Sequence, residues 1–98
     1  MEIINNDNFD KTINSGEVLI DFYADWCGPC RMLSPILENI DKENIISIKK
    51  VNVDESIDIA RKYGVMTIPT LILFRNGTEI KRNVGLMSKD QIIEFINK

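Results

Sequence analysis

Residues 19–30 read Leu-Ile-Asp-Phe-Tyr-Ala-Asp-Trp-Cys-Gly-Pro-Cys and place two cysteines three positions apart, directly after a β-branched and aromatic run. The run, Val18–Tyr23, is almost continuously apolar, which predicts a strand that is buried on both faces. Pro29 suits the first turn of a helix, because its fixed φ is already helical and its missing N–H would have no partner there. This stretch therefore predicts a central strand that leads into a helix, with the cysteines at the junction.

The position of the two cysteines favours redox chemistry. Residues i and i+3 of a helix lie on the same face, so Cys27 and Cys30 can approach to within disulfide range. The free N–H groups and the positive end of the helix dipole lie beside Cys27, and both favour a thiolate over a thiol. We therefore predict a dithiol that opens and closes, with Cys27 as its nucleophile.

Two other uses of the cysteines are a structural staple and half of a zinc site. Closing so small a ring contributes about 2 kcal/mol, against nearly 5 for a loop of about 100 residues, so a staple would be placed elsewhere. Structural zinc usually takes four Cys and His ligands, and the chain has two cysteines and no histidine. Redox chemistry is therefore favoured, and no metal site is expected.

Length and composition set limits on the class of protein. A chain of 98 residues is sufficient for one core and too short for two. Twelve basic residues are scattered among fifteen acidic ones, for a net charge of −3, which argues against binding to nucleic acid. No run approaches the roughly 20 apolar residues that span a bilayer, and the first residues, with an acid at position 2, do not resemble a secretory signal. We expect no membrane association and a reducing, cytoplasmic location, where a cysteine pair is more often catalytic than structural.

The rest of the chain predicts an α/β protein. Asn76-Gly77 between two apolar runs predicts a hairpin, and Ser88 with Gln91 predicts a capping box. The order β-α-β-α-β-α-β-β-α predicts a mixed sheet with helices on both faces, and the site at the carboxyl end of the central strand. The other expected strands are Glu2–Asn5, Ile45–Val53, Thr70–Phe74 and Thr78–Val84. One helix is expected to be capped by Asp7, and another by Asp54, with Ile57, Ala60 and Tyr63 aligned on one face. Between them we expect one kinked helix that runs from Pro29 through Pro35 and carries an apolar stripe of Met32, Leu33, Ile36, Leu37 and Ile40.

Three features together resemble the thioredoxin family. They are Trp-Cys-Gly-Pro-Cys at 26–30, Asp21 six residues before the first cysteine, and Ile-Pro-Thr at 68–70, and the resemblance extends over essentially the whole chain. It implies the thioredoxin fold, a single mixed central sheet of about five strands with about four helices on both faces. It also implies that residues 1–98 form one thioredoxin domain.

The resemblance implies a role for four residues in the exchange reaction. Cys27 would attack a client disulfide, and Cys30 would resolve the mixed disulfide. Asp21 would be a buried carboxylate that accepts the proton of Cys30, directly or through a water, and Lys50 would lie near it. By strand position alone Asp21 would more often face solvent, although its same-face neighbours Leu19 and Tyr23 argue for burial. Lys50 is equally well explained as an ordinary lysine at the end of a strand.

The family pattern also implies a surface that binds the client. Pro69 matches a proline that the family holds in the cis form facing the cysteines, next to a residue 68 whose backbone pairs with an extended client. Trp26 would shield the thiolate, although packing alone could explain it, and a plain turn could explain Gly85. The expected substrate-binding residues are Trp26, Gly28, Pro29, Met66, Thr67, Ile68, Pro69 and Gly85.

The function that the resemblance implies is that of a monomeric protein-disulfide reductase. It would bind no cofactor, because the dithiol is the redox group, and a thioredoxin reductase drawing on NADPH or another donor would reduce it again. Its clients would include ribonucleotide reductase, peroxiredoxins and methionine sulfoxide reductases. The alternatives are a disulfide oxidase or isomerase, which usually carries His between the cysteines, and a non-catalytic subunit of a larger complex.

Overall fold

The computed structural model describes residues 1–98 and contains five strands and four helices in the predicted order. The elements are β1 (Glu2–Ile3), α1 (Phe9–Ile13), β2 (Glu17–Tyr23), α2 (Gly28–Lys42), β3 (Ser47–Asn52), α3 (Ile57–Lys62), β4 (Thr70–Arg75), β5 (Thr78–Val84) and α4 (Lys89–Asn97).

The strands form one mixed sheet in the order β1-β3-β2-β4-β5, with β2 at its centre as predicted. Strand β2 runs parallel to β3 and antiparallel to β4. The predicted hairpin joins β4 to β5, and both turn residues have positive φ, 50° at Asn76 and 85° at Gly77. Asparagine and glycine tolerate this left-handed backbone better than other residues, which is why the turn forms here.

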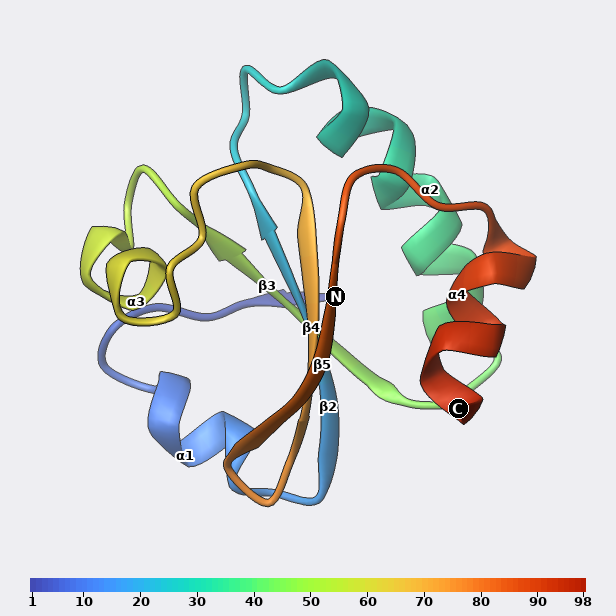
Figure 1. The fold of residues 1–98 in the computed structure, drawn as a ribbon, viewed down its shortest axis with the longest axis horizontal. Helices are drawn as coiled ribbons and strands as arrows, with labels where there is room; N and C mark the ends of the chain where they lie inside the picture. The colour runs from blue at the N-terminus through green and yellow to red at the C-terminus, as the bar shows by residue number, and fades with distance from the viewer.

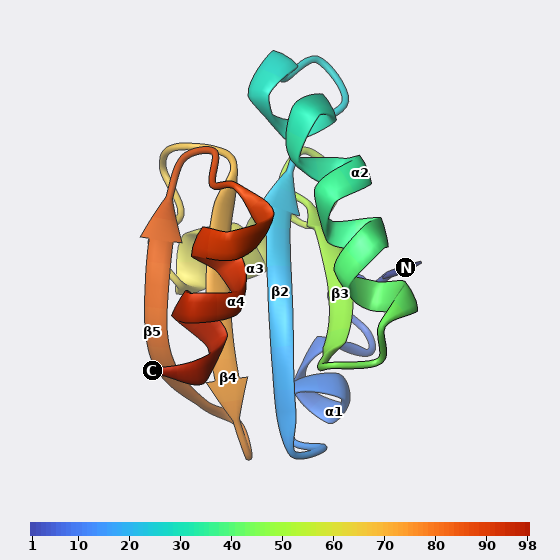
Figure 2. The same cartoon turned by 90° about the vertical axis from the view of Figure 1, so that its right-hand side faces the viewer.

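Helices cover both faces of the sheet. Figure 1 views the sheet close to edge-on, with α1 and α3 on one side and α2 and α4 on the other. Figure 2 looks onto the second face, where α2 crosses in front of β2 and β3. Because side chains alternate along a strand, β2 directs Ile20 and Phe22 into the core under α1 and Leu19 into the core under α2 and α4. Asp21 shares the face of Leu19 and therefore lies beneath the α2 layer.

Two apolar clusters hold these layers together. On the α1 side, the ring of Phe9 packs edge-on against Phe74, with 5.7 Å between centroids, and lies 5.4 Å from the ring of Tyr63. On the other side, Leu33, Leu37 and Ile40 of α2 are fully buried against the sheet. The buried members of the second cluster are Leu19, Leu33, Leu37, Ile40, Ile46, Ile48, Leu71, Leu73, Ile92 and Ile96.

The apolar stripe of α2 is narrower than predicted. Met32 was expected to fill the core, but 61% of it is exposed. The buried residues of this helix recur at 33, 37 and 40, and position 32 lies about 100° around the helix from position 33. The helix itself continues through Pro35 as one element, as expected.

Two predicted helix caps were wrong and one is confirmed. The N-cap of α1 is Asn8 rather than Asp7, and the N-cap of α3 is Ser56 rather than Asp54. Ile57 of α3 was expected to line up with buried residues, but it is 47% exposed, and the buried residues of this helix are Ile59 and Ala60. The capping box of Ser88 and Gln91 is present at the start of α4.

Candidate active site

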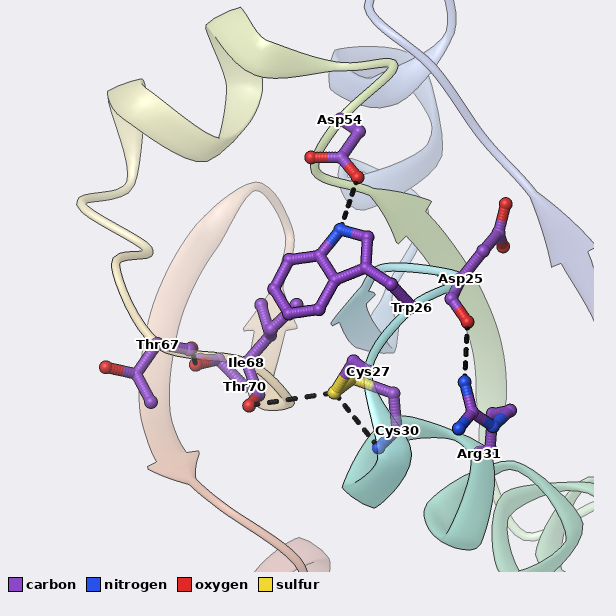
Figure 3. Close-up of a disulfide and its surroundings, with 9 residues drawn as sticks. All are labelled: Asp25, Trp26, Cys27, Cys30, Arg31, Asp54, Thr67, Ile68 and Thr70. Atoms are coloured by element: carbon purple, nitrogen blue, oxygen red, sulfur yellow. Dashed lines mark hydrogen bonds between the residues drawn. A yellow bond between two sulfur atoms is a disulfide. The ribbon is translucent and has the colours of Figure 1, made fainter.

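The two cysteines lie where β2 ends and α2 begins. Cys27 is the N-cap of α2, and Cys30 lies in its first turn. Their Cα atoms are 5.2 Å apart and their sulfurs form a disulfide (Figure 3). Pro29 occupies the first turn, where its missing N–H leaves no gap in the hydrogen bonding. The backbone therefore holds the pair in a geometry that already permits the bond.

Electrostatics distinguish Cys27 from Cys30, whereas exposure does not. Each cysteine is 4% exposed. The Sγ of Cys27 accepts a hydrogen bond from the backbone N–H of Cys30 at 3.2 Å, at the positive end of the helix dipole. Both interactions stabilise negative charge on this sulfur. Cys27 is therefore the better placed of the two to act as a thiolate.

The segment before β4 closes over the disulfide. The Ile68–Pro69 peptide bond is cis. The carbonyl oxygen of Ile68 lies 3.9 Å from the Sγ of Cys27, and neither the N–H nor the carbonyl of Ile68 bonds to another backbone group. Pro69 accepts a hydrogen bond from the N–H of Gly85 at 2.8 Å, and Thr67 accepts one from the hydroxyl of Thr70 at 2.5 Å. These bonds fix the segment on both sides of a backbone that is free to pair with another chain.

Trp26 flanks the disulfide on the outside. Although 69% of it is exposed, its indole N–H donates a hydrogen bond to the Oδ2 of Asp54 at 2.8 Å (Figure 3). Asp54 was predicted to cap a helix, and its contact with Trp26 was missed. The two residues are 28 positions apart, and no spacing rule connects them. The bond fixes the orientation of a large aromatic surface beside the sulfurs.

The remaining predicted client-binding residues differ in their solvent exposure. Met66 is 95% exposed and Thr67 is exposed, next to Ile68. Gly28 is half-buried and Pro29 is exposed at the start of α2. With Trp26 they belong to the two segments, at the start of α2 and before β4, that meet at the two almost buried sulfurs. We call Trp26, Met66 and Ile68 the apolar rim of the site.

Asp21 is buried, as predicted from its apolar neighbours. It has no exposed surface, and neither carboxyl oxygen has a hydrogen-bond partner. Burial raises the pKa of Asp21 from 3.8 to about 7, and the charge of Lys50 opposes this rise. A carboxyl group with a pKa near neutrality can take up and release a proton under physiological conditions.

Lys50 is the register partner of Asp21 on the adjacent strand, but it does not form an ion pair with it. Its ammonium lies 3.4 Å from the Oγ of Ser34 and 4.2 Å from the centre of the Tyr23 ring. Sequence reasoning missed Ser34, although its position four residues after Cys30 places it on the same face of α2. The resemblance indicated the neighbourhood of Lys50, and the structure shows which groups its ammonium contacts.

Two wider features of the molecule concern cofactors and membranes. No group of three or more His, Cys, Asp and Glu side chains is arranged to hold a metal ion. None of the four helices is long and apolar enough to cross a bilayer.

Comparisons with known proteins agree with this geometry. The family model described as thioredoxin matches residues 1–98. A thioredoxin from Chlamydia pneumoniae is 52% identical over 99 residues, which cover 100% of this chain and 97% of the relative. A thioredoxin from Bacillus subtilis (strain 168) is 43% identical over 93 residues, with 93% and 89% covered. Among solved structures, a mutant thioredoxin from Halobacterium salinarum NRC-1 superposes with a TM-score of 0.90 at 38% identity, over 98% of this chain and 87% of that one.

Proposed function

Since the chain belongs to the thioredoxin family and is a protein-disulfide reductase, we propose that Cys27 and Cys30 divide the exchange between them, Cys27 attacking the client and Cys30 resolving the intermediate. The observation that carries this assignment is the hydrogen bond from the N–H of Cys30 to the Sγ of Cys27 at the start of α2. It stabilises a thiolate on Cys27 and has no counterpart at Cys30.

In the first step, the Cys27 thiolate attacks one sulfur of a client disulfide. A bond forms between the two sulfurs, the client S–S bond breaks, and the electron pair of that bond leaves on the second client sulfur, which takes a proton from water. The product is a mixed disulfide. Because the leaving group is a client thiolate, no cofactor takes part in this step.

In the second step, Cys30 attacks the Sγ of Cys27 as a thiolate. The Cys27–Cys30 bond forms and the mixed disulfide breaks. The client sulfur leaves with the electron pair of that bond and takes a proton from water, so the client departs as a dithiol that has gained two electrons. Cys30 must first lose its proton, and Asp21, with its pKa of about 7, would accept it directly or through a water. The disulfide seen in the structure corresponds to the oxidised form of the protein after one cycle.

The apolar rim and the backbone of Ile68 would bind the client. An extended segment can pair with the N–H and carbonyl of Ile68, as a strand pairs with the edge of a sheet, because neither group bonds to another part of the backbone. Trp26 and Met66 would contact apolar side chains on either side of the client cysteine. Thr67, Pro69 and Gly85 would hold the segment in place rather than contact much of the client.

Members of the thioredoxin family act with a thioredoxin reductase and with disulfide-bonded client proteins. For this chain we propose a monomer in the cytoplasm that receives electrons from such a reductase, fed by NADPH or another donor. Ribonucleotide reductase, peroxiredoxins and methionine sulfoxide reductases are the client classes that the family resemblance favours. The dithiol itself would be the redox group, with no bound cofactor.

Serine substitutions test the division of roles. With a small disulfide-bonded protein such as insulin as client, Cys30→Ser should accumulate a mixed disulfide through Cys27, detected by mass spectrometry of the acid-quenched, unreduced protein. Cys27→Ser should form no such adduct and should lose reductase activity.

The opposite pattern, an adduct with Cys27→Ser and none with Cys30→Ser, would reverse the assignment. Reductase activity that persists after both cysteines are replaced would show that the dithiol is not the source of the activity.

A further inference from the structure

Asp21 is a buried carboxyl group without a partner. Its oxygens have no exposed surface and accept no hydrogen bond. The neighbouring strands place Lys50 on one side of it and Leu71 on the other. An ammonium in register with a partnerless carboxylate would ordinarily move into an ion pair, because the buried carboxylate has no solvent to stabilise its charge. Here the lysine points elsewhere, and something must hold it there.

Two groups from different elements hold the Lys50 ammonium. The Oγ of Ser34, on α2, lies 3.4 Å from Nζ. The ring of Tyr23, at the end of β2, lies beneath Nζ with its centre 4.2 Å away, within the range of a cation–π interaction. We call Ser34 and Tyr23 the ammonium seat. Both members are fixed, Tyr23 by burial on the central strand and Ser34 by its position in the second turn of α2.

The seat borders the cysteine site. Cys30, Ser34, Tyr23 and Lys50 line one cavity of about 190 Å³ beneath the first turns of α2. A cavity of this size has room for water between Lys50 and Cys30. Lys50 and Cys30 therefore face the same cavity.

The charged and titratable groups around Asp21 are few. Lys50 is its register partner on β3 and Tyr23 lies two residues along its own strand, whereas β4 contributes the apolar Leu71. From α2, Cys30 lines the same cavity as Lys50 and Tyr23. Asp25 and Arg31 also line the cavity. The guanidinium of Arg31 donates a hydrogen bond to the backbone carbonyl of Asp25 at 2.9 Å. Lys50 is thus the cation whose position decides how strongly the ionised form of Asp21 is stabilised.

We propose that Ser34 is a positioning residue for the dithiol exchange: with the ring of Tyr23, it holds the Lys50 ammonium short of an ion pair with Asp21, which keeps the buried carboxyl able to accept and release a proton near neutral pH. A direct ion pair would keep Asp21 permanently ionised and make it a poor proton donor in the reverse reaction. Without the lysine, the carboxyl would ionise only at higher pH. The ammonium seat therefore keeps the attraction between Lys50 and the Asp21 carboxylate weaker than a direct ion pair but stronger than none.

This inference rests on the proposed role of Asp21, but its test does not. The carboxyl carbon of Asp21 is titrated by ¹³C NMR in the disulfide form, with no client present. In Ser34→Ala the ammonium loses its hydroxyl partner and moves toward the carboxylate, so the pKa of Asp21 should fall by about one pH unit. Whether Asp21 assists Cys30 is a separate matter, decided by the rate of mixed-disulfide resolution.

Three further variants separate positioning from a simple effect of packing. Ser34→Thr keeps the hydroxyl and should restore the wild-type titration, and Tyr23→Phe keeps the ring and should leave it unchanged. In a Lys50→Met background, where the pKa of Asp21 should rise, Ser34→Ala should cause no further change. An unchanged titration in Ser34→Ala, or a fall that persists without Lys50, would overturn the proposal.

Discussion

At the scale of the residue, Asp21 is the group of the site whose burial is electrostatically unfavourable. It is ionisable, fully buried and without a hydrogen-bond partner, and a single offset cation opposes its desolvation. A stable fold retains such a group at a cost in stability, because the ionised form is penalised only when the chain is folded. The same desolvation raises the pKa of Asp21 into the range that suits proton transfer at neutral pH.

The cost predicts a stability change with a definite sign. The folded pKa of Asp21, about 7, lies above its ordinary value of 3.8, so between these values the folded protein holds a proton that the unfolded chain has lost. Raising the pH through this window therefore lowers the free energy of unfolding, until the effect levels off above pH 7. Between pH 5 and pH 8 the wild type should lose about 3 kcal/mol relative to Asp21→Asn.

Urea unfolding of the disulfide forms at the two pH values measures this difference, and comparison with the Asn variant cancels the contribution of all other groups. Parallel stability curves for the two proteins across this range would show that Asp21 does not titrate as its burial requires.

Residue contacts were also the least predictable part of the site. The cysteines and Pro29 follow from local rules, because their geometry is set within one helical turn. The burial of Asp21 followed from its apolar neighbours on the same strand face. The bond of Trp26 to Asp54 joins residues 28 positions apart, and whether such groups meet depends on the packing of the loop after β3.

At the scale of the element, helix α2 carries the site and α4 supports it. Leu33, Leu37 and Ile40 anchor α2 to the sheet, and Ile92 and Ile96 bring α4 into the same apolar cluster. Apolar spacing predicted these contacts well. It failed where a neighbouring apolar residue, Met32, lay just outside the stripe, because the sequence does not show how wide a face the sheet can cover.

The start of α4 depends on its capping box. The hydroxyl of Ser88 accepts the N–H of Gln91 at 3.2 Å, and the side-chain oxygen of Gln91 accepts the N–H of Ser88 at 2.9 Å. Ser88→Ala should therefore lower the free energy of unfolding by about 1 kcal/mol in urea. Ser15→Ala is the matched control, because that side chain is exposed and lies outside the helices and strands, and it should change stability by less than about 0.5 kcal/mol. Equal effects of the two substitutions would show that the box does not stabilise α4.

At the scale of the whole molecule, the order of elements and the mixed sheet were predicted from the sequence, because apolar periodicity, the Asn-Gly turn and the right-handed crossover each limit the topology. Element ends were less certain, and the true caps Asn8 and Ser56 each lie within two residues of the predicted ones. Adjacent polar residues compete for such positions, and neither the Asn8 nor the Ser56 side chain makes a capping hydrogen bond to the first turn of its helix.

The equilibrium reduction potential of the Cys27–Cys30 pair tests the central claim most directly. It is measured by trapping free thiols after incubation in graded glutathione buffers, and each 30 mV corresponds to about 1.4 kcal/mol for this two-electron couple. A disulfide reductase requires a potential more negative than that of the cytosolic glutathione pool, so that electrons flow from the pair to its clients. A potential well above that of the pool would mean that the pair donates its disulfide instead, and would contradict the reductase account in favour of an oxidase or isomerase.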